Sequence, residues 1–356
     1  MGLLARVDGL AGGVRGVHGA LAGRMAAAGG SGSLAAAASR HDVSTPTFAS
    51  LPLLQYFRVD VCATVEQAAC VLRNEAPFEA LQMRALRVSA EVMAAEEAAV
   101  LDLATAVPVH ASLRDLQLVE LPLQEPAVLD AICAASLALR TVALMSCDLE
   151  PASVPALVRL ISGGPNLLDF AIADNDAQLF DAAGGAALAA ALAASRLTHL
   201  MLSKVDFWHD AGAGVAVVQA LTGHPTLQSL NLGGNVPADE GAAGGALGAL
   251  VAANAPALTA LDVASSLFGD FGMVPIMEAL PRNTHLRDLR CTNSNMSDDF
   301  AREHFLPAVL ANTSLRKLKA SFYWDNEPDG VPPPEVLEAE ALVRARRRGE
   351  RRADAT

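Results

Sequence analysis

The sequence predicts an α/β solenoid in which parallel strands line a concave face and helices cover the convex face. One observation is a repeat of about 29 residues, with an apolar residue at its first, fourth and sixth positions. A second is that a segment with apolar residues at helical spacing follows most copies. The cleanest copy begins at Leu227, continues through Leu230 and Leu232, and closes at Asn235. Recurrence of one strand-and-helix module is the sequence signature of a solenoid.

The array contains ten repeats, of which eight keep the spacing closely. From Leu113 onward, successive repeats start 26 to 31 residues apart. The first two repeats, which start at Leu51 and Phe78, fit loosely, with Leu54 and Leu81 at their fourth positions. Because alternate residues of a strand point to opposite faces, the fourth and sixth positions are expected to enter the core. The later starts are Leu139, Leu167, Leu197, Leu227, Leu258, Leu286 and Leu315.

The ninth position of the repeat carries a small polar residue in five copies. Such a side chain can bond to backbone groups left open where the chain leaves the strand, and adjacent repeats can continue the ladder. Val205 and Tyr323 stand at this position in two other copies and are expected to interrupt the ladder. The polar ninth residues are Cys147, Asn175, Asn235, Ser266 and Ser294.

Two segments of different composition flank the repeat domain, which is predicted over residues 51–326. Residues 1–50 are rich in Gly, Ala and Ser, and their apolar residues follow a helical spacing that five glycines interrupt. This segment is expected to be a disordered leader, a targeting signal or a membrane-surface helix. Residues 327–356 begin with a proline-rich stop and continue as an arginine-rich helix. A solvated tail is the preferred interpretation, and a nuclear-import or anionic-partner patch is the alternative.

Charge and composition argue against several classes of partner. The formal net charge is −13, and residues 141–280 carry 13 Asp and Glu against three Lys and Arg. An acidic middle disfavours nucleic acid or an anionic membrane as the ligand. No apolar run reaches the roughly 18 residues that a membrane helix needs, so no membrane span is predicted.

The five cysteines are odd in number and scattered, without a Cys-x-x-Cys pair. This pattern is typical of reduced, buried thiols in a protein of a reducing compartment. We therefore expect a cytoplasmic protein, with secretion into a host cell as the alternative. The cysteines are Cys62, Cys70, Cys133, Cys147 and Cys291.

Sequence motifs for catalysis are missing. The chain contains no Gly-Lys-Ser/Thr phosphate loop, no His-Glu-x-x-His helix and no Gly-x-Ser-x-Gly elbow. His224 and His285 lie at turns of different repeats, where capping or solvent exposure is the preferred interpretation over metal ligation. Cys291 stands at an inward strand position and is interpreted as a structural thiol. We therefore expect no enzyme activity, no metal and no cofactor.

The repeat resembles the ribonuclease-inhibitor-type class of leucine-rich repeat. The resemblance rests on the Leu-x-x-Leu-x-Leu-x-x-Asn/Cys pattern and covers residues 51–326. It implies a leucine-rich-repeat solenoid, or horseshoe. The Ala/Gly-rich segments 182–188 and 240–247 are similar to repeats of bacterial leucine-rich-repeat effectors that are delivered into host cells. The long segment between the second and third repeats, and the ninth positions without Asn, depart from the family pattern.

The third, fifth, seventh and eighth positions are expected to face the concave side and to form a protein-binding surface. Phe207-Trp208-His209 and Phe322-Tyr323-Trp324 each follow a strand, and aromatic residues are common anchors of interfaces. The second segment is interpreted first as a cap on the last repeat. Trp208 is the first choice for a contact residue. Candidate binding residues are His199, Met201, Lys204, Phe207, Trp208, His209, Asn231, Asp262, Arg290, Lys319 and Phe322.

The function predicted from these observations is that of a non-enzymatic scaffold for protein–protein interaction. It is expected to be monomeric and to bind a protein partner on its concave face, and a secreted bacterial effector is the narrower form of this hypothesis. The alternative is a regulator of an enzyme, either a GTPase activator or the substrate receptor of a ubiquitin ligase, as some proteins of similar repeat type are.

Overall fold

The fold is described from a computed structural model of the chain. The chain divides into two compact units, Met1–Leu53 and Leu54–Thr356. All residues that the structure describes belong to the second unit. They are residues 61–63, 85–89, 114–119, 123, 129–130, 132–133, 137–175, 179–321 and 332–353.

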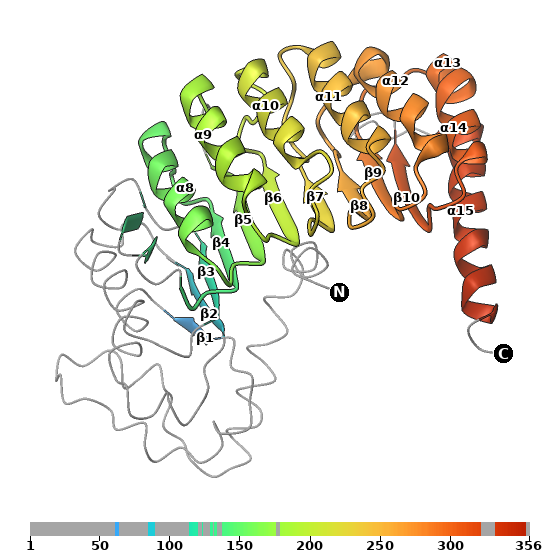
Figure 1. Cartoon of the computed structure of the whole chain (residues 1–356). Coiled ribbons are helices and arrows are strands. Elements are labelled where there is room, and N and C mark those ends of the chain that lie inside the picture. The colour runs from blue at the N-terminus through green and yellow to red at the C-terminus, as the bar shows by residue number, and fades with distance from the viewer. Residues whose placement is uncertain are drawn as a thin grey trace, which may run out of the picture. The chain divides into compact units, whose positions relative to one another are not determined.

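The described residues form an α/β fold with one sheet of ten strands, in which every strand is parallel to its neighbours. Strand order in the sheet is the order in the chain, so each repeat adds its strand beside that of the preceding repeat (Figure 1). The strands are β1 Val61–Ala63, β2 Ala85–Ser89, β3 Asp115–Val119, β4 Thr141–Met145, β5 Asp169–Ala173, β6 His199–Ser203, β7 Ser229–Asn231, β8 Ala260–Asp262, β9 Asp288–Thr292 and β10 Lys317–Ser321.

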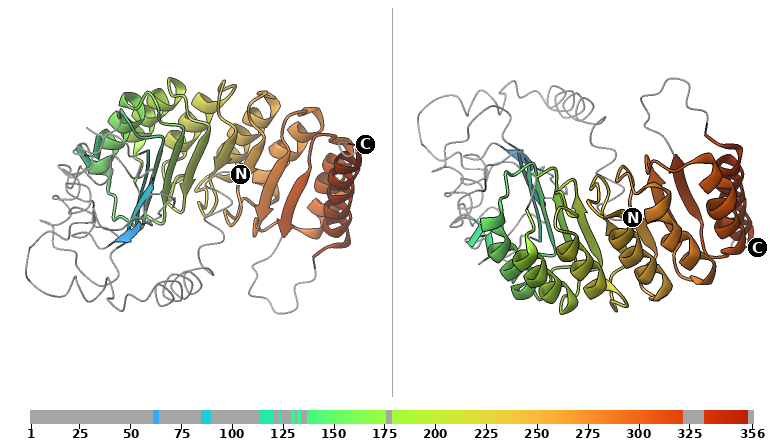
Figure 2. Two further views of the ribbon diagram at one scale, coloured as in Figure 1. Left: turned by 90° about the horizontal axis from the view of Figure 1, so that it is seen from below. Right: turned by 90° about the horizontal axis from the view of Figure 1, so that it is seen from above.

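Helices α8 to α12 alternate with the strands and pack side by side on one face of the sheet, as Figures 1 and 2 show. A short 3-10 helix, Pro151–Ser153, precedes α8, another, Leu280–Arg282, follows α12, and a π-helical turn, Ala301–Phe305, precedes α14. The α-helices are α8 Val154–Gly163, α9 Ala182–Ala193, α10 Ala211–Leu221, α11 Glu240–Ala252, α12 Gly269–Ala279, α13 Asp298–Phe300, α14 Leu306–Ala311 and α15 Pro334–Ala353.

The core lies between the sheet and this helical layer. The fourth and sixth positions of the eight repeats from Leu113 onward are buried, as the periodicity predicts. Alternation brings them to one face of each strand, where they pack under the helices. These residues are Leu116, Leu118, Val142, Leu144, Phe170, Ile172, Leu200, Leu202, Leu230, Leu232, Leu261, Val263, Leu289, Cys291, Leu318 and Ala320.

The prediction for the first two repeats is wrong in register. In β2, Leu86 pairs with Leu116 of β3, so Leu86 holds the fourth position that was assigned to Leu81. In β1, Val61 pairs with Leu86 and takes the place assigned to Leu54. Sheet pairing, which is non-local, decides the register where the leucine pattern is loose.

The ladder of polar ninth residues is present, and Asn235 is its fullest member. Its Oδ1 accepts hydrogen bonds from the backbone N–H groups of Val205 and Phe207, at 2.9 and 3.1 Å. Its Nδ2 donates to the carbonyls of Leu202 and Leu232, both at 2.7 Å. Val205 has no polar side-chain atom with which to continue the ladder toward the preceding repeat, as predicted. Equivalent bonds join Asn175 to Cys147 and Leu149, and Ser266 to Asn235.

The residue before the ninth position adopts a left-handed backbone in every fully described repeat from β4 to β9. This conformation turns the chain out of the strand, and it is accessible to Gly, Asn and Asp at the least cost. Serine and lysine also adopt it here, because the hydrogen bonds of the ladder hold the turn from the adjacent ninth position. These residues are Ser146, Asp174, Lys204, Gly234, Ser265 and Asn293, with φ between 51° and 75°.

Helix α15 closes the carboxy-terminal end of the array. It packs against β10 and α14, and its residues Val336, Ala339 and Val343 are 1%, 0% and 1% exposed. The expectation of a solvated tail is therefore wrong, because an apolar stripe on the helix covers the last repeat. The segment Phe322 to Trp324, which was interpreted as the cap, lies outside the described residues.

Candidate recognition surface

The face of the sheet opposite the helices is the candidate site, and it is called the open face below. Parallel pairing aligns its side chains in rows that cross the strands, one row for each outward position. No chain segment of the described helical layer packs on it. Its residues are Asp115, Gln117, Val119, Thr141, Ala143, Met145, Asp169, Ala171, Ala173, His199, Met201, Ser203, Ser229, Asn231, Ala260, Asp262, Asp288, Arg290, Thr292, Lys317, Lys319 and Ser321.

A histidine–aspartate pair lies near the middle of the open face. The Nδ1 atom of His199 is 2.6 Å from Oδ1 of Asp169 in the adjacent strand, and the two side chains are 28% and 25% exposed. Thr198 donates to the same carboxylate oxygen at 3.1 Å, and Thr141 donates to the other at 3.4 Å. The partly exposed ring and carboxylate can both hydrogen-bond to a binding partner.

The row through the fifth positions of the open face is apolar from β4 to β6. Ala143 and Ala171 are followed in it by Met201, and these residues are 0%, 1% and 7% exposed. They are therefore buried and offer a partner little contact area. Met145, at the carboxyl end of β4, is half-buried and is the more accessible apolar side chain of this area.

Charged residues dominate the open face from β8 to β10. The Arg290 guanidinium lies 3.7 Å from Asp262 of the adjacent strand and 4.0 Å from Asp288 of its own strand. Lys317 is 3.0 Å from Asp288, while Lys319 in the next outward position is exposed. The face therefore ends in basic side chains at β10, and carboxylates of a partner can pair with them.

Two further predicted residues lie in the turns beyond the strands. Lys204 pairs with Asp174 of the preceding repeat at 2.9 Å, so it lies at the rim of the open face. His209 is half-exposed and 3.4 Å from Asp206, in the loop that leads to α10 instead of on the open face. Among the predicted binding residues, the structure thus brings together His199, Met201, Lys204, Asn231, Asp262, Arg290 and Lys319.

The prediction that Trp208 and Phe207 contact a partner is wrong. Their exposed fractions are 0% and 1%, and the rings of both pack edge-to-face, with centroids 4.7 Å apart. Gly214 of α10 leaves room for the indole, because a Cβ there would lie 2.4 Å from the ring. Phe322 lies outside the described residues.

A signal for this burial was present in the sequence. Phe180 occupies the strand-to-helix loop of the preceding repeat and Phe268 that of the second repeat after it, and both are also buried, at 2% and 0% exposure. Phe207 contacts Phe180, and Trp208 contacts Phe268, at centroid distances of 6.3 and 6.2 Å. Aromatic residues that recur in the strand-to-helix loops form a shared core layer. The prediction of Trp208 as an isolated surface anchor did not consider this recurrence.

The described thiols, Cys133, Cys147 and Cys291, belong to the core or its edge. Burial raises the pKa of Cys291 to about 12, with smaller contributions from Asp262 and Glu340. Burial likewise raises the pKa of Cys133 to about 11. A thiol with so high a pKa holds its proton at neutral pH and is a poor nucleophile. This agrees with the interpretation of Cys291 as a structural residue.

Metal centres and membrane-spanning helices are two other classes of site that the described residues could form. Within the described ranges, no group of three or more His, Cys, Asp and Glu side chains is placed to hold a metal ion. None of the helices described is both long and apolar enough to cross a bilayer. A scan against protein-family models and a search of curated proteins both find no match.

Proposed function

We propose that this chain is a leucine-rich-repeat protein of the ribonuclease-inhibitor type that binds a protein partner on its open face without a catalytic step. The observation that carries the proposal is the open face itself, a set of side chains held in rows by one continuous parallel sheet. In a horseshoe this face is the concave one. A rigid backbone lowers the entropy cost of binding, because few groups must be ordered at the interface.

The chemistry of the open face supports a protein ligand. The half-buried Met145 offers an apolar contact, and the partly exposed pair of His199 and Asp169 offers hydrogen bonds. The charged end of the face around Arg290 and Lys319 contains both signs of charge. A mixture of apolar, polar and charged groups is the usual composition of a protein–protein interface. The odd number of scattered cysteines supports a reducing compartment, such as the cytosol, as its place of action.

The experiment compares a variant of the open face with a matched control. The Arg290→Glu/Lys319→Glu variant reverses two charges on the open face. The Arg196→Glu/Arg282→Glu variant makes the same change at two exposed arginines outside it. Each full-length chain is used for proximity labelling in the source cells, and labelled proteins are quantified by mass spectrometry.

We expect a defined set of proteins to be enriched by the wild type and the control but lost with the open-face variant. Reversal of two interfacial charges lowers affinity by roughly tenfold or more. If the open-face variant enriches the same proteins to the same level as the control, the open face is not the binding surface and the proposal is wrong.

A further inference from the structure

Helix α15 presents two different faces. Its inner face covers the last repeat, and Arg346 on that side donates to the carbonyls of Val309 and Leu310, both at 3.2 Å. On the opposite side, residues three or four apart share one line along the helix. This outer face of α15 consists of Leu337, Ala341, Arg344, Ala345 and Arg348.

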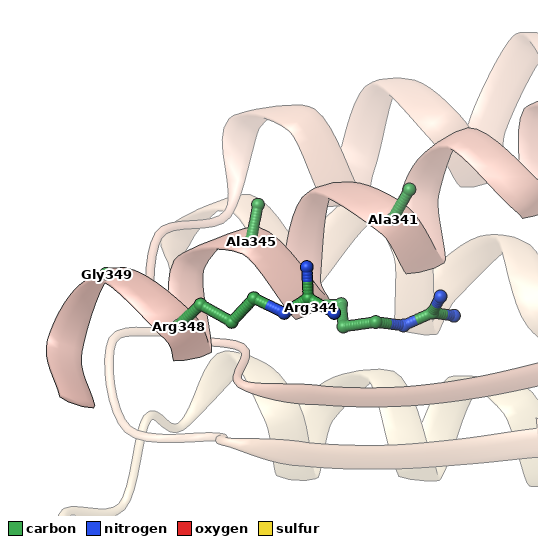
Figure 3. Close-up of a pocket in the computed structure, with 5 residues that line it drawn as sticks. All are labelled: Ala341, Arg344, Ala345, Arg348 and Gly349. Carbon is green, nitrogen blue, oxygen red and sulfur yellow. The ribbon is translucent and has the colours of Figure 1, made fainter. Parts of the chain in front are cut away.

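A pocket that is open to solvent lies on the outer face. It has a volume of about 430 Å³ and is lined by Ala341, Arg344, Ala345, Arg348 and Gly349. In Figure 3, the side chains of Arg344 and Arg348 lie one behind the other along the helix, with Ala341 and Ala345 beside them. Residues this small let another backbone approach closely, while the arginine stems form a wall.

The positive charge of the outer face is only partly neutralised. Arg344 lies 3.5 Å from Glu340 on the same helix. Arg348 has no ion-pair partner among the described residues, whereas Arg316 and Arg346 are engaged inside the fold. Guanidinium groups bind carboxylates through two parallel hydrogen bonds, which makes an exposed pair of arginines selective for acidic side chains.

The face also has an apolar component. Leu337 is 50% exposed one turn before Ala341, so the stripe of small residues starts at a large apolar side chain. An amphipathic helix of a partner would bury Leu337 and lie along Ala341 and Ala345, as in groove recognition of helical peptides. Acidic residues flanking its apolar stripe would meet Arg344 and Arg348.

We propose that the outer face of α15 binds an acidic amphipathic helix of a partner protein. This surface is separate from the open face, so the proposal goes beyond the proposed function and does not depend on it. A nucleic-acid duplex fits less well, because it has no apolar stripe with which to cover Leu337. The exposed Glu338 lies beside this stripe, so the glutamates of the partner helix that bind are expected on the side of Arg344 and Arg348.

The test uses the full-length chain and a fluorescein-labelled helical peptide of about 15 residues. The peptide carries leucines along one stripe and glutamates on both sides of it, and a second peptide has glutamines in place of the glutamates. Binding is measured by fluorescence anisotropy at low and at high salt. We expect the acidic peptide to bind more tightly than the glutamine peptide and to weaken as salt screens the arginines.

Two variants separate docking from general attraction. Arg344→Gln/Arg348→Gln should weaken the acidic peptide about tenfold or more, whereas the control Arg196→Gln/Arg282→Gln, with the same change in charge, should not. Ala345→Trp keeps every charge but fills the pocket, so it should also weaken binding. Circular dichroism checks that each variant is folded.

Three results with the peptides would overturn the proposal. They are no binding of the acidic peptide, equal loss with the control arginines, and full binding by Ala345→Trp. A fourth is binding of short duplex DNA or phosphatidylserine vesicles as tight as that of the peptide, which would assign the outer face to polyanions. Binding to the open face is measured by proximity labelling in a separate experiment. A negative result with the peptides therefore does not contradict the proposed function.

Discussion

At the scale of single residues, polar side chains close the loops where helices end and the next strands begin. Nδ1 of the buried His224 accepts from the N–H of Leu227 at 3.2 Å, and its Nε2 lies 3.2 Å from the carbonyl oxygen of Leu192. Asn283 and Asn312 stand at the same position of later repeats and make the same kind of bonds. His224 is therefore a capping residue, as its place at a turn indicated.

This equivalence predicts that asparagine can replace His224 and that alanine cannot. His224→Ala should lower the free energy of unfolding by about 1–3 kcal/mol, because buried backbone groups lose their partners. His224→Asn should retain most of that stability. Urea denaturation followed by circular dichroism measures both variants. Equal losses would mean that the ring contributes by packing instead of by hydrogen bonds.

At the scale of helices, glycine allows neighbouring helices of the helical layer to touch. A Cβ at Gly244 of α11 would lie 2.1 Å from the carbonyl oxygen of Gly272 in α12, and a Cβ at Gly248 would lie 2.7 Å from Pro275. In α9, a Cβ at Gly185 would be 2.3 Å from the Cβ of Ala213. The Ala/Gly-rich composition of these segments thus has a structural cause, which is close packing of adjacent repeats.

Two adjacent glycines of α11 give a matched test. Gly244→Ala should destabilise the protein by about 1–3 kcal/mol, because the added methyl group must push α12 away. Gly245→Ala has nothing within 4 Å of its new Cβ and should stabilise the helix by up to about 1 kcal/mol. Thermal unfolding measures the difference. If both changes shift the melting temperature alike, contact between α11 and α12 is not what requires glycine at position 244.

At the scale of the array, α15 protects its last strand. Glu340 accepts a hydrogen bond from the N–H of Ala320 at 3.2 Å, so a side chain of α15 serves a backbone donor of β10. Glu350 pairs with Arg316 and, at 3.8 Å, with Arg287. The hydrogen bond from Arg316 lowers the pKa of Glu350, so these pairs persist at neutral pH and are lost only when acid protonates the carboxylate. Strand edges without such cover invite association with other chains.

Two substitutions in α15 test this role. Val343→Asp places a carboxylate in the apolar contact with the last repeat and should cost about 3 kcal/mol or more. Leu337→Asp makes a similar change on the outer face and should be nearly neutral. Hydrogen exchange of the β10 amides should rise with the first variant and not with the second. Unchanged protection of β10 in Val343→Asp would show that the strand does not need the helix.

The leucine pattern alone predicted the order of the repeats, the strand and helix alternation, the polar ladder and most of the open face. It could do so because alternation along a strand is local, and because each repeat packs on a neighbour that has the same pattern. Lys204, Arg290 and Lys319 reach the face or its rim for this reason.

Tertiary packing decided the rest. Trp208 turned inward because Gly214 makes room for its ring and Phe268, two repeats further along the chain, contacts it. The register of β1 and β2 followed from pairing with β3. The sequence showed that residues 335–356 could form a helix, but only packing against the last strand, which buries Val343 and leaves Arg348 outside, determined which side of the helix faces solvent.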